Sequence, residues 1–169
     1  MYLFYLENVY FCICLYSVQH IRESLGTSRV AFFGRVLQEV NSYTNPYTIV
    51  FDDTKTNIGD AFNPTLGIFT APTDGVYVFS VTIQTVSVGY GFIYVHKNHD
   101  IISGLMYATD SFKSPQSTTE TIVLELRQGD IVYVEISSTG SSLIPRSGFS
   151  TFAGFLLWET APVEIIVGK

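Results

Sequence analysis

The spacing of turn residues is the feature that most constrains what this chain can fold into. From Arg29 onward, Gly, Pro, Asn and Asp interrupt the sequence about every 8 to 12 residues, as in Asn45-Pro46, Asn63-Pro64 and Gln128-Gly129-Asp130. No stretch shows sustained helical periodicity. The spacing therefore predicts an all-β sandwich.

The segments between these turns read as strands. Those predicted are Val30–Val36, Tyr47–Phe51, Gly67–Thr70, Val76–Val86, Phe92–His96, Ile101–Tyr107, Thr119–Leu126, Ile131–Ser137 and Thr151–Trp158. In segment 76–86 the odd positions from 77 to 83 are apolar and the even positions from 80 to 84 are polar. One face of this strand therefore packs into a core, and the other is wetter.

Two predicted strands are apolar on both faces and need a cover on the outer one. Segment 92–95 is one, and in segment 151–158 the apolar residues Ala153, Phe155 and Leu157 alternate with Phe152, Leu156 and Trp158. Only 14% of the chain is charged, too little to coat an ordinary monomer. We therefore expect oligomerisation, and the interface candidates are Phe92, Tyr94, Phe152, Leu156 and Trp158.

Length and charge limit the other possibilities. The 169 residues suit one domain, which we expect at residues 29–160, between an apolar segment at 1–28 and a tail at 161–169. The net charge of −6 and the absence of a basic stripe argue against a nucleic-acid partner.

The first 18 residues differ from the rest of the chain, and three interpretations stay open. The segment is a degenerate signal or anchor, a membrane helix, or a partly ordered tail. It carries Glu7 and no Lys or Arg, which fits neither a secretory signal nor an uninterrupted membrane span. A membrane contact is expected only if residues 1–18 act as an anchor. Cys12 and Cys14 both lie here and are interpreted as buried or membrane-adjacent thiols.

No pattern indicates catalysis, a cofactor or a metal. Ser150 lies in Gly148-Phe149-Ser150-Thr151-Phe152, where Phe replaces the closing glycine of a nucleophile elbow. His96, His99 and Asp100 span a strand end and a turn, and we interpret them as a surface hairpin with incidental histidines. The carboxylates at 52, 53 and 60 are interpreted as solvated turn residues, since they lack EF-hand spacing. We therefore predict that the chain is not an enzyme.

One block is more specific than any of these patterns. Its anchors are Phe51, Asn57, Phe62, Phe69, Gly75, Tyr77 and Phe79. Their order and spacing resemble the signature of the complement C1q globular-head family, with Val81 where the family usually has an aromatic. The resemblance extends from about Arg29 to Glu159 and includes Ser150–Leu157, which is similar to the family's closing strand.

The resemblance implies a jelly-roll β-sandwich of about ten antiparallel strands, like that of tumour necrosis factor. It also implies a non-enzymatic homotrimer of the secreted, globular-head-only type, because no collagen stalk is present. Such a module would act in lectin-like pattern recognition in innate immunity, related to complement, binding glycans, microbial surface patterns or protein ligands. The alternative is a signalling ligand of the tumour necrosis factor or adipokine type that acts on a cell-surface receptor.

Some relatives also bind calcium near the trimer axis. The loop that would supply ligands here contains Asp110 as a weak calcium candidate and Ser114-Pro115 where an acidic ligand would be sought. We therefore expect no metal and no cofactor.

Overall fold

The computed structural model describes residues 28–38, 45–85, 89–109, 115–137 and 147–160. Within these ranges the chain forms strands and no helix. The strands are β1 (Ala31–Arg35), β2 (Tyr47–Thr48), β3 (Asp53–Ile58), β4 (Phe62–Asn63), β5 (Ile68–Thr70), β6 (Gly75–Thr85), β7 (Gly89–Lys97), β8 (Asp100–Thr109), β9 (Gln116–Leu126), β10 (Ile131–Ser137) and β11 (Thr151–Glu159). The predicted segment 1–28, except Ser28, and the tail 161–169 lie outside the described residues.

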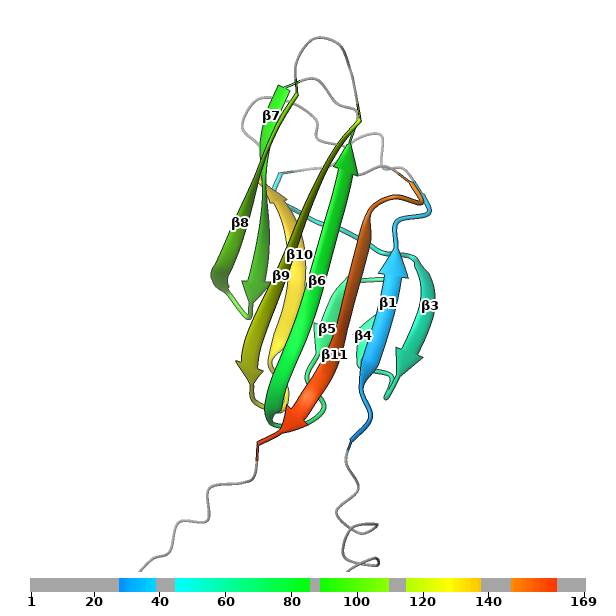
Figure 1. The fold of residues 1–169 in the computed structure, drawn as a ribbon, viewed down its shortest axis with the longest axis vertical. Helices are drawn as coiled ribbons and strands as arrows, with labels where there is room; N and C mark the ends of the chain where they lie inside the picture. The colour runs from blue at the N-terminus through cyan, green and yellow to red at the C-terminus, as the bar shows by residue number, and fades with distance from the viewer. Residues whose placement is uncertain (1–27, 39–44, 86–88, 110–114, 138–146, 161–169) are drawn as a thin grey trace, which may run out of the picture.

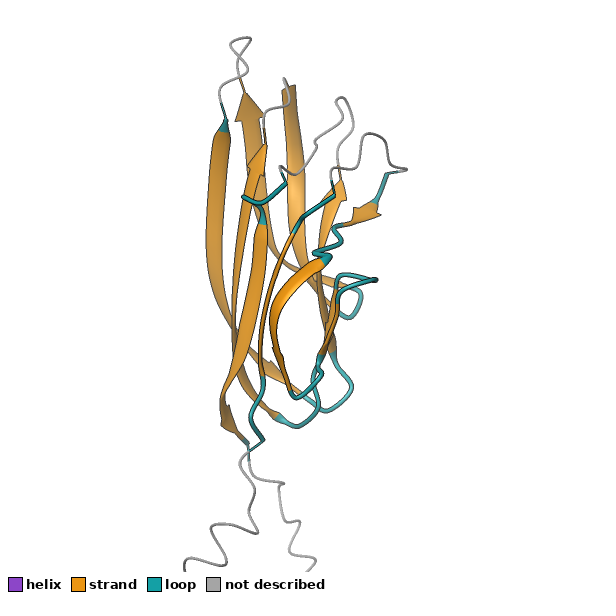
Figure 2. Ribbon diagram, turned by 90° about the vertical axis from the view of Figure 1, so that its right-hand side faces the viewer, coloured by secondary structure: helices purple, strands orange, loops and turns teal. Residues whose placement is uncertain are grey.

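The strands form two antiparallel sheets packed face to face (Figures 1 and 2). The five-stranded sheet has the order β3-β1-β11-β6-β9. The six-stranded sheet has the order β4-β5-β10-β7-β8, and β2 pairs with the far end of β10. Strands distant in the sequence, such as β1 and β11, are neighbours, which is the connectivity of a jelly roll. The predicted fold class is therefore confirmed.

Aromatic rings from both sheets fill the core. Phe32 of β1 stacks on Phe62 with ring centroids 4.5 Å apart, and the edge of the Phe152 ring meets it at 4.9 Å. Phe69 and Phe79 join the sheets through an edge contact at 5.1 Å. Six of the seven signature positions are buried: Phe51, Phe62, Phe69, Gly75, Tyr77 and Phe79. The signature is thus mainly a packing requirement.

The seventh signature residue, Asn57, acts through hydrogen bonds. Its side-chain Nδ2 donates to the Phe62 carbonyl at 2.9 Å, and the Phe62 N–H donates to Asn57 Oδ1 at 3.1 Å. One side chain therefore satisfies both backbone groups of Phe62 and holds β4 against the end of β3.

Glycine at position 154 is required by the close approach of two rings. A Cβ on Gly154 would lie 2.6 Å from Phe32 Cε1 and 2.6 Å from Phe79 Cδ1. The prediction that this glycine lets an aromatic approach closely is confirmed. Gly154 also fixes the orientation of β11, because its inward position places Phe152 and Leu156 inward as well.

Some strands differ from the prediction. β3 and β4 were not expected, and only Tyr47–Thr48 of the predicted strand 47–51 forms a ladder. β3 reads Asp-Thr-Lys-Thr-Asn-Ile, without the apolar alternation that marks a half-buried strand. It forms because it pairs with β1 at the edge of its sheet, which is a tertiary contact.

β8 and β9 are the last strands of the two sheets on the opposite side of the sandwich. A hydrogen bond from the Ser103 hydroxyl of β8 to Glu120 Oε1 of β9 links them. Glu120 pairs in register with Val81, a core residue, so its side chain points between the sheets. Its other oxygen, Oε2, is buried and has no hydrogen-bond partner among the described residues.

Candidate interaction surfaces

The outer face of the five-stranded sheet carries a continuous row of apolar side chains. Register pairs Ile58 with Ala31, Ala31 with Phe155, Phe155 with Val78, and Val78 with Val123, so the row crosses all five strands. Phe155 is 45% exposed, and Ile58 and Val123 are more exposed than that. We call this row the apolar sheet face. A row of this kind is typical of an interaction surface.

A β-bulge extends the apolar sheet face towards one end of the sandwich. Leu156 pairs with Tyr77 and Trp158 pairs with Val76, so Leu157 is the extra residue. Because the bulge shifts the alternation by one, Leu157 and Trp158 are both exposed, Trp158 at 55%. They line a groove of about 970 Å³ together with Ile58 of β3 and the residues preceding β1.

The structure corrects part of the predicted interface. Phe152 has 0% exposure and lies in the aromatic core, so a second copy of the chain cannot reach its side chain, and its choice as an interface residue is wrong. Leu156 is half-buried and packs against the same core. Trp158 is exposed, and Phe92 and Tyr94 are half-buried on the outer face of the other sheet.

That other face carries a second group of aromatic rings. Phe92 and Tyr94 of β7 lie nearly parallel with centroids 6.1 Å apart, and His96 stacks on Tyr133 of β10 at 4.8 Å. His96 is only 7% exposed. The hairpin of β7 and β8 was predicted, but His96 is buried in it, and only His99 in the turn is exposed as expected for a surface histidine.

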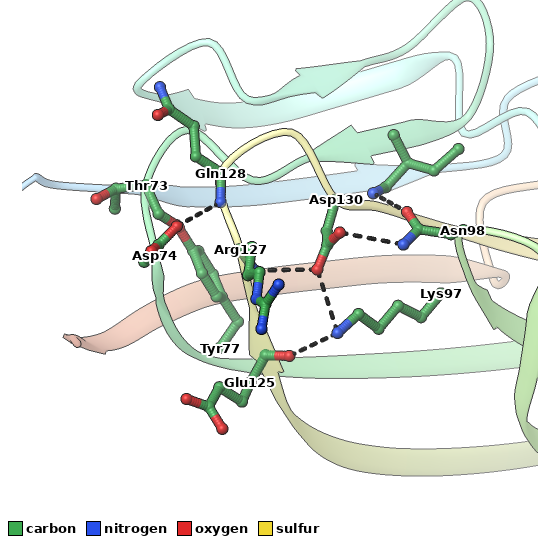
Figure 3. A network of polar contacts seen from close by, with 10 residues as sticks. Thr73, Asp74, Tyr77, Lys97, Asn98, Glu125, Arg127, Gln128 and Asp130 are labelled. Atoms are coloured by element: carbon green, nitrogen blue, oxygen red, sulfur yellow. Dashed lines mark hydrogen bonds and ion pairs between the residues drawn. The ribbon is translucent and has the colours of Figure 1, made fainter. Parts of the chain in front are cut away.

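A polar network ties three turns together at one end of the sandwich (Figure 3). Asp130 accepts hydrogen bonds from the Arg127 N–H at 2.9 Å and the Asn98 amide at 3.0 Å, and its Oδ2 lies 3.1 Å from Lys97 Nζ. Asp74 accepts the N–H of Gln128 at 2.7 Å. These residues line a polar cleft of about 590 Å³. Because its carboxylates are taken up by partners within the protein, the network fixes the turns.

Electrostatics agree with this structural role. Burial alone would raise the pKa of Asp130, but the Arg127 N–H, the Asn98 amide and the Lys97 ammonium together hold that pKa below its ordinary value. Hydrogen bonds from Lys55 and Arg35 likewise lower the pKa of Asp53. Asp53 is thus a paired residue of β3, rather than the solvated turn carboxylate expected from the sequence.

The other residues weighed for chemistry are also accounted for. Ser150 is completely buried, and its hydroxyl accepts the Gln84 N–H at 3.1 Å and lies 3.2 Å from the Gln84 carbonyl. It therefore joins the start of β11 to β6 and is not presented to a substrate. Across the ranges described above, no three His, Cys, Asp or Glu side chains gather in a way that suits a metal ion. Asp110, Cys12 and Cys14 lie outside the described residues.

The two-layer jelly roll with an exposed apolar sheet face defines a class of β-sandwich domains that assemble or recognise partners through their surfaces. Residues 31–157 match the family described as C1q domain. The chain belongs to the C1q domain family. The family resemblance of the signature residues is thereby confirmed, and it supports a C1q-type recognition module.

Curated relatives agree in sequence. The chain is 34% identical over 115 residues to mouse complement C1q tumor necrosis factor-related protein 3, covering 66% of this chain and 45% of that protein. It is 32% identical over 144 residues to a polypeptide of the rat complement C1q subcomponent, covering 81% of this chain and 54% of that protein. The aligned part is thus about half the length of these relatives. In zebrafish Caprin-2, 32% identical over 132 residues, it is only 14%.

Solved structures agree in fold. The globular domain of zebrafish complement 1qA protein aligns with a TM-score of 0.65 at 20% identity, covering 78% of this chain and 99% of that one. Murine APRIL at pH 5.0 aligns with a TM-score of 0.62 at 13% identity, over 76% and 99% of the two chains. Both are similar to this chain in architecture.

Sequence reasoning missed the central residues of the apolar sheet face. Ile58 lies on the unpredicted strand β3, and Val123 lies on a strand without a clear apolar alternation. A usable signal for Phe155 was Gly154, since a glycine between large residues marks the crowded face of a strand.

Proposed function

We propose that this protein is a non-enzymatic, secreted recognition module of the C1q type that assembles as a homotrimer. The trimer binds glycans, microbial surface patterns or protein ligands in innate immunity. Membership of the family and the exposed apolar sheet face support the proposal. The observation that carries the assembly is the row from Ile58 to Val123, because a monomer in water would leave these side chains uncovered.

The shape of the exposed apolar surface supports a ring. A second apolar strip lies along edge strand β8, where Ile101, Ile102 and Met106 are exposed. The strip and the apolar sheet face use different residues. Contacts between two different surfaces are heterologous, and they generate a closed ring when the rotation closes. In the proposed trimer the β8 strip of each copy covers the apolar sheet face of the next.

The domain boundaries and localisation belong to the same proposal. Residues 29–160 form the recognition domain, flanked by the segment 1–28 and the tail 161–169. Secretion is supported by the similarity to a polypeptide of complement C1q and to a C1q tumor necrosis factor-related protein. In the part of the chain that the structure covers, no helix has the length and hydropathy needed to cross a membrane.

Analytical ultracentrifugation tests the assembly. Wild-type protein at micromolar concentration should sediment as a trimer, and Phe155→Ser should dissociate it, because it removes the central ring of the apolar sheet face. Leu66→Ser is the matched control, since Leu66 is exposed to a similar extent but lies in the turn between β4 and β5. Circular dichroism verifies that both variants fold. A monomeric wild type, or a trimeric Phe155→Ser protein, would contradict the proposed interface.

A glycan array and a panel of bacterial surfaces test recognition. Three linked copies gain avidity of about 10² or more over one copy. The wild-type trimer should therefore bind a multivalent surface at least about 10² times more tightly than the dissociated Phe155→Ser protein. Residues 97–100, at the turn between β7 and β8, are a candidate binding loop. Equal binding by trimer and monomer would argue against multivalent recognition.

A signalling ligand is the second candidate, and the similarity in fold to APRIL and to an Eiger TNF structure favours it. The Eiger TNF structure aligns with a TM-score of 0.55 at 18% identity, covering 80% of this chain and 97% of that one. Chemical crosslinking on intact cells separates the two functions. Capture of one membrane receptor without glycan or bacterial binding would favour signalling.

A further inference from the structure

The imidazole of His96 is buried without hydrogen bonds. The residue is 7% exposed, and neither Nδ1 nor Nε2 has a hydrogen-bond partner among the described residues. A neutral imidazole carries one donor and one acceptor, and leaving either group buried and unpaired costs free energy. An unsatisfied buried group of this kind calls for a physical explanation.

The groups around the ring suit a cation better than a neutral imidazole. Glu135 of β10 places its Oε1 3.5 Å from His96 Nε2. The Tyr133 ring lies parallel to the imidazole at 4.8 Å with an angle of 4°, and Tyr94 approaches it at 84° with centroids 6.3 Å apart. A carboxylate and an aromatic face both attract a positive charge.

The other groups near His96 do not compete for this charge. Register places Ile101 of β8 opposite His96, Ile68 of β5 opposite Tyr133, and Thr48 of β2 opposite Glu135, and none of these side chains is charged. Lys97, next along β7, contacts Asp130 and the Glu125 carbonyl. Asp100 pairs in register with Lys97 at the end of the hairpin and is exposed.

We propose that His96 and Glu135 form a proton-dependent contact that joins β7 to β10. With a neutral ring, the pair lies at 3.5 Å without a hydrogen bond. Protonation adds a full charge opposite the carboxylate and against the Tyr133 face, so the attraction between the two strands increases. Histidine is the side chain that ordinarily changes charge between about pH 5 and pH 8. The contact therefore strengthens as the medium becomes acidic.

The consequence is a surface that responds to pH. β7 also carries Phe92 and Tyr94, so the outer face of the six-stranded sheet is held more firmly when His96 is protonated. The folded state then binds the proton more tightly than the unfolded chain does. By linkage, this contribution to stability is present at low pH and is lost as the pH rises.

A double-mutant cycle tests the contact. His96→Phe keeps a ring on Tyr133 and removes both nitrogens, and Glu135→Gln removes the charge. Urea unfolding of wild type, both single variants and the double variant, at one protein concentration, gives the coupling between the two residues. We expect a coupling of about tenfold in the unfolding equilibrium constant near pH 5.5 and less than about twofold near pH 8. Equal coupling at both pH values would overturn the proposal.

A second measurement is independent of the Glu135 variant. If Glu135→Gln does not fold, the stability of His96→Phe relative to wild type is measured from about pH 8 to about pH 5.5. The wild type should gain about tenfold in the unfolding equilibrium constant over His96→Phe across this range. His99→Gln, in the exposed turn three positions further on, is the control and should follow the wild type. Parallel pH curves for wild type and His96→Phe would also overturn the proposal.

Discussion

Replacing Gly154 by Ala should destabilise the domain strongly, because the core has no space for one more methyl group. The new Cβ would lie 2.6 Å from ring atoms of both Phe32 and Phe79. An ordinary contact is about 3.4 Å, so each ring must move by roughly 0.8 Å. Phe32 is stacked on Phe62 at 4.5 Å and Phe79 lies against Phe69 at 5.1 Å, so neither ring can move alone.

Inserting a carbon into a packed core typically costs about 1–3 kcal/mol, and two blocked rings place this site at the upper end. We therefore expect a loss of about 3 kcal/mol, or about 10 °C in Tm for a domain of this size. Urea unfolding and calorimetry measure the two quantities. Gly129→Ala is the control: its φ of 89° makes a side chain strained, but no atom lies within 4 Å of the new Cβ. It should lose only about 1 kcal/mol. A Gly154→Ala protein as stable as Gly129→Ala would refute the packing argument.

Two further substitutions test the polar contacts. Asn57→Ala leaves both backbone groups of Phe62 unpaired and should lower the free energy of unfolding by about 2 kcal/mol in urea, whereas Asn63→Ala, at an exposed turn, should lose less than half of that. Asp130 has a lowered pKa, so its stabilising contribution is present above the unfolded value of about 3.9 and is lost as the pH falls. Asp130→Asn should therefore show a flatter loss of stability between about pH 5 and pH 3, and a curve as steep as that of the wild type would contradict the assignment.

The sequence was sufficient to predict the sandwich because turn spacing and alternation are local signals. The strand at 76–86 appears nearly as predicted, and its inward residues Tyr77 and Phe79 are completely buried. β3 was missed because its stability comes from pairing with β1, and nothing in its polar residues announces that contact.

The interface was predicted less well because it depends on parity along β11. Strict alternation places Trp158 on the same face as Phe152, and both were chosen as interface residues. The bulge at Leu157 reverses the alternation, so Trp158 is exposed while Phe152 lies in the core. A bulge depends on the neighbouring strand, so a single sequence does not reveal it.

The carboxylate that Glu120 directs between the sheets bears on the life of the newly made chain. β9 is an eleven-residue strand at the edge of its sheet, and such an edge can template uncontrolled strand addition before the correct partner arrives. A foreign strand closing over this edge would enclose Glu120 further from water, although its Oε2 already lacks a partner among the described residues. The same side chain that weakens the core locally thus discourages fibre-like aggregation while the copies of the chain are still separate.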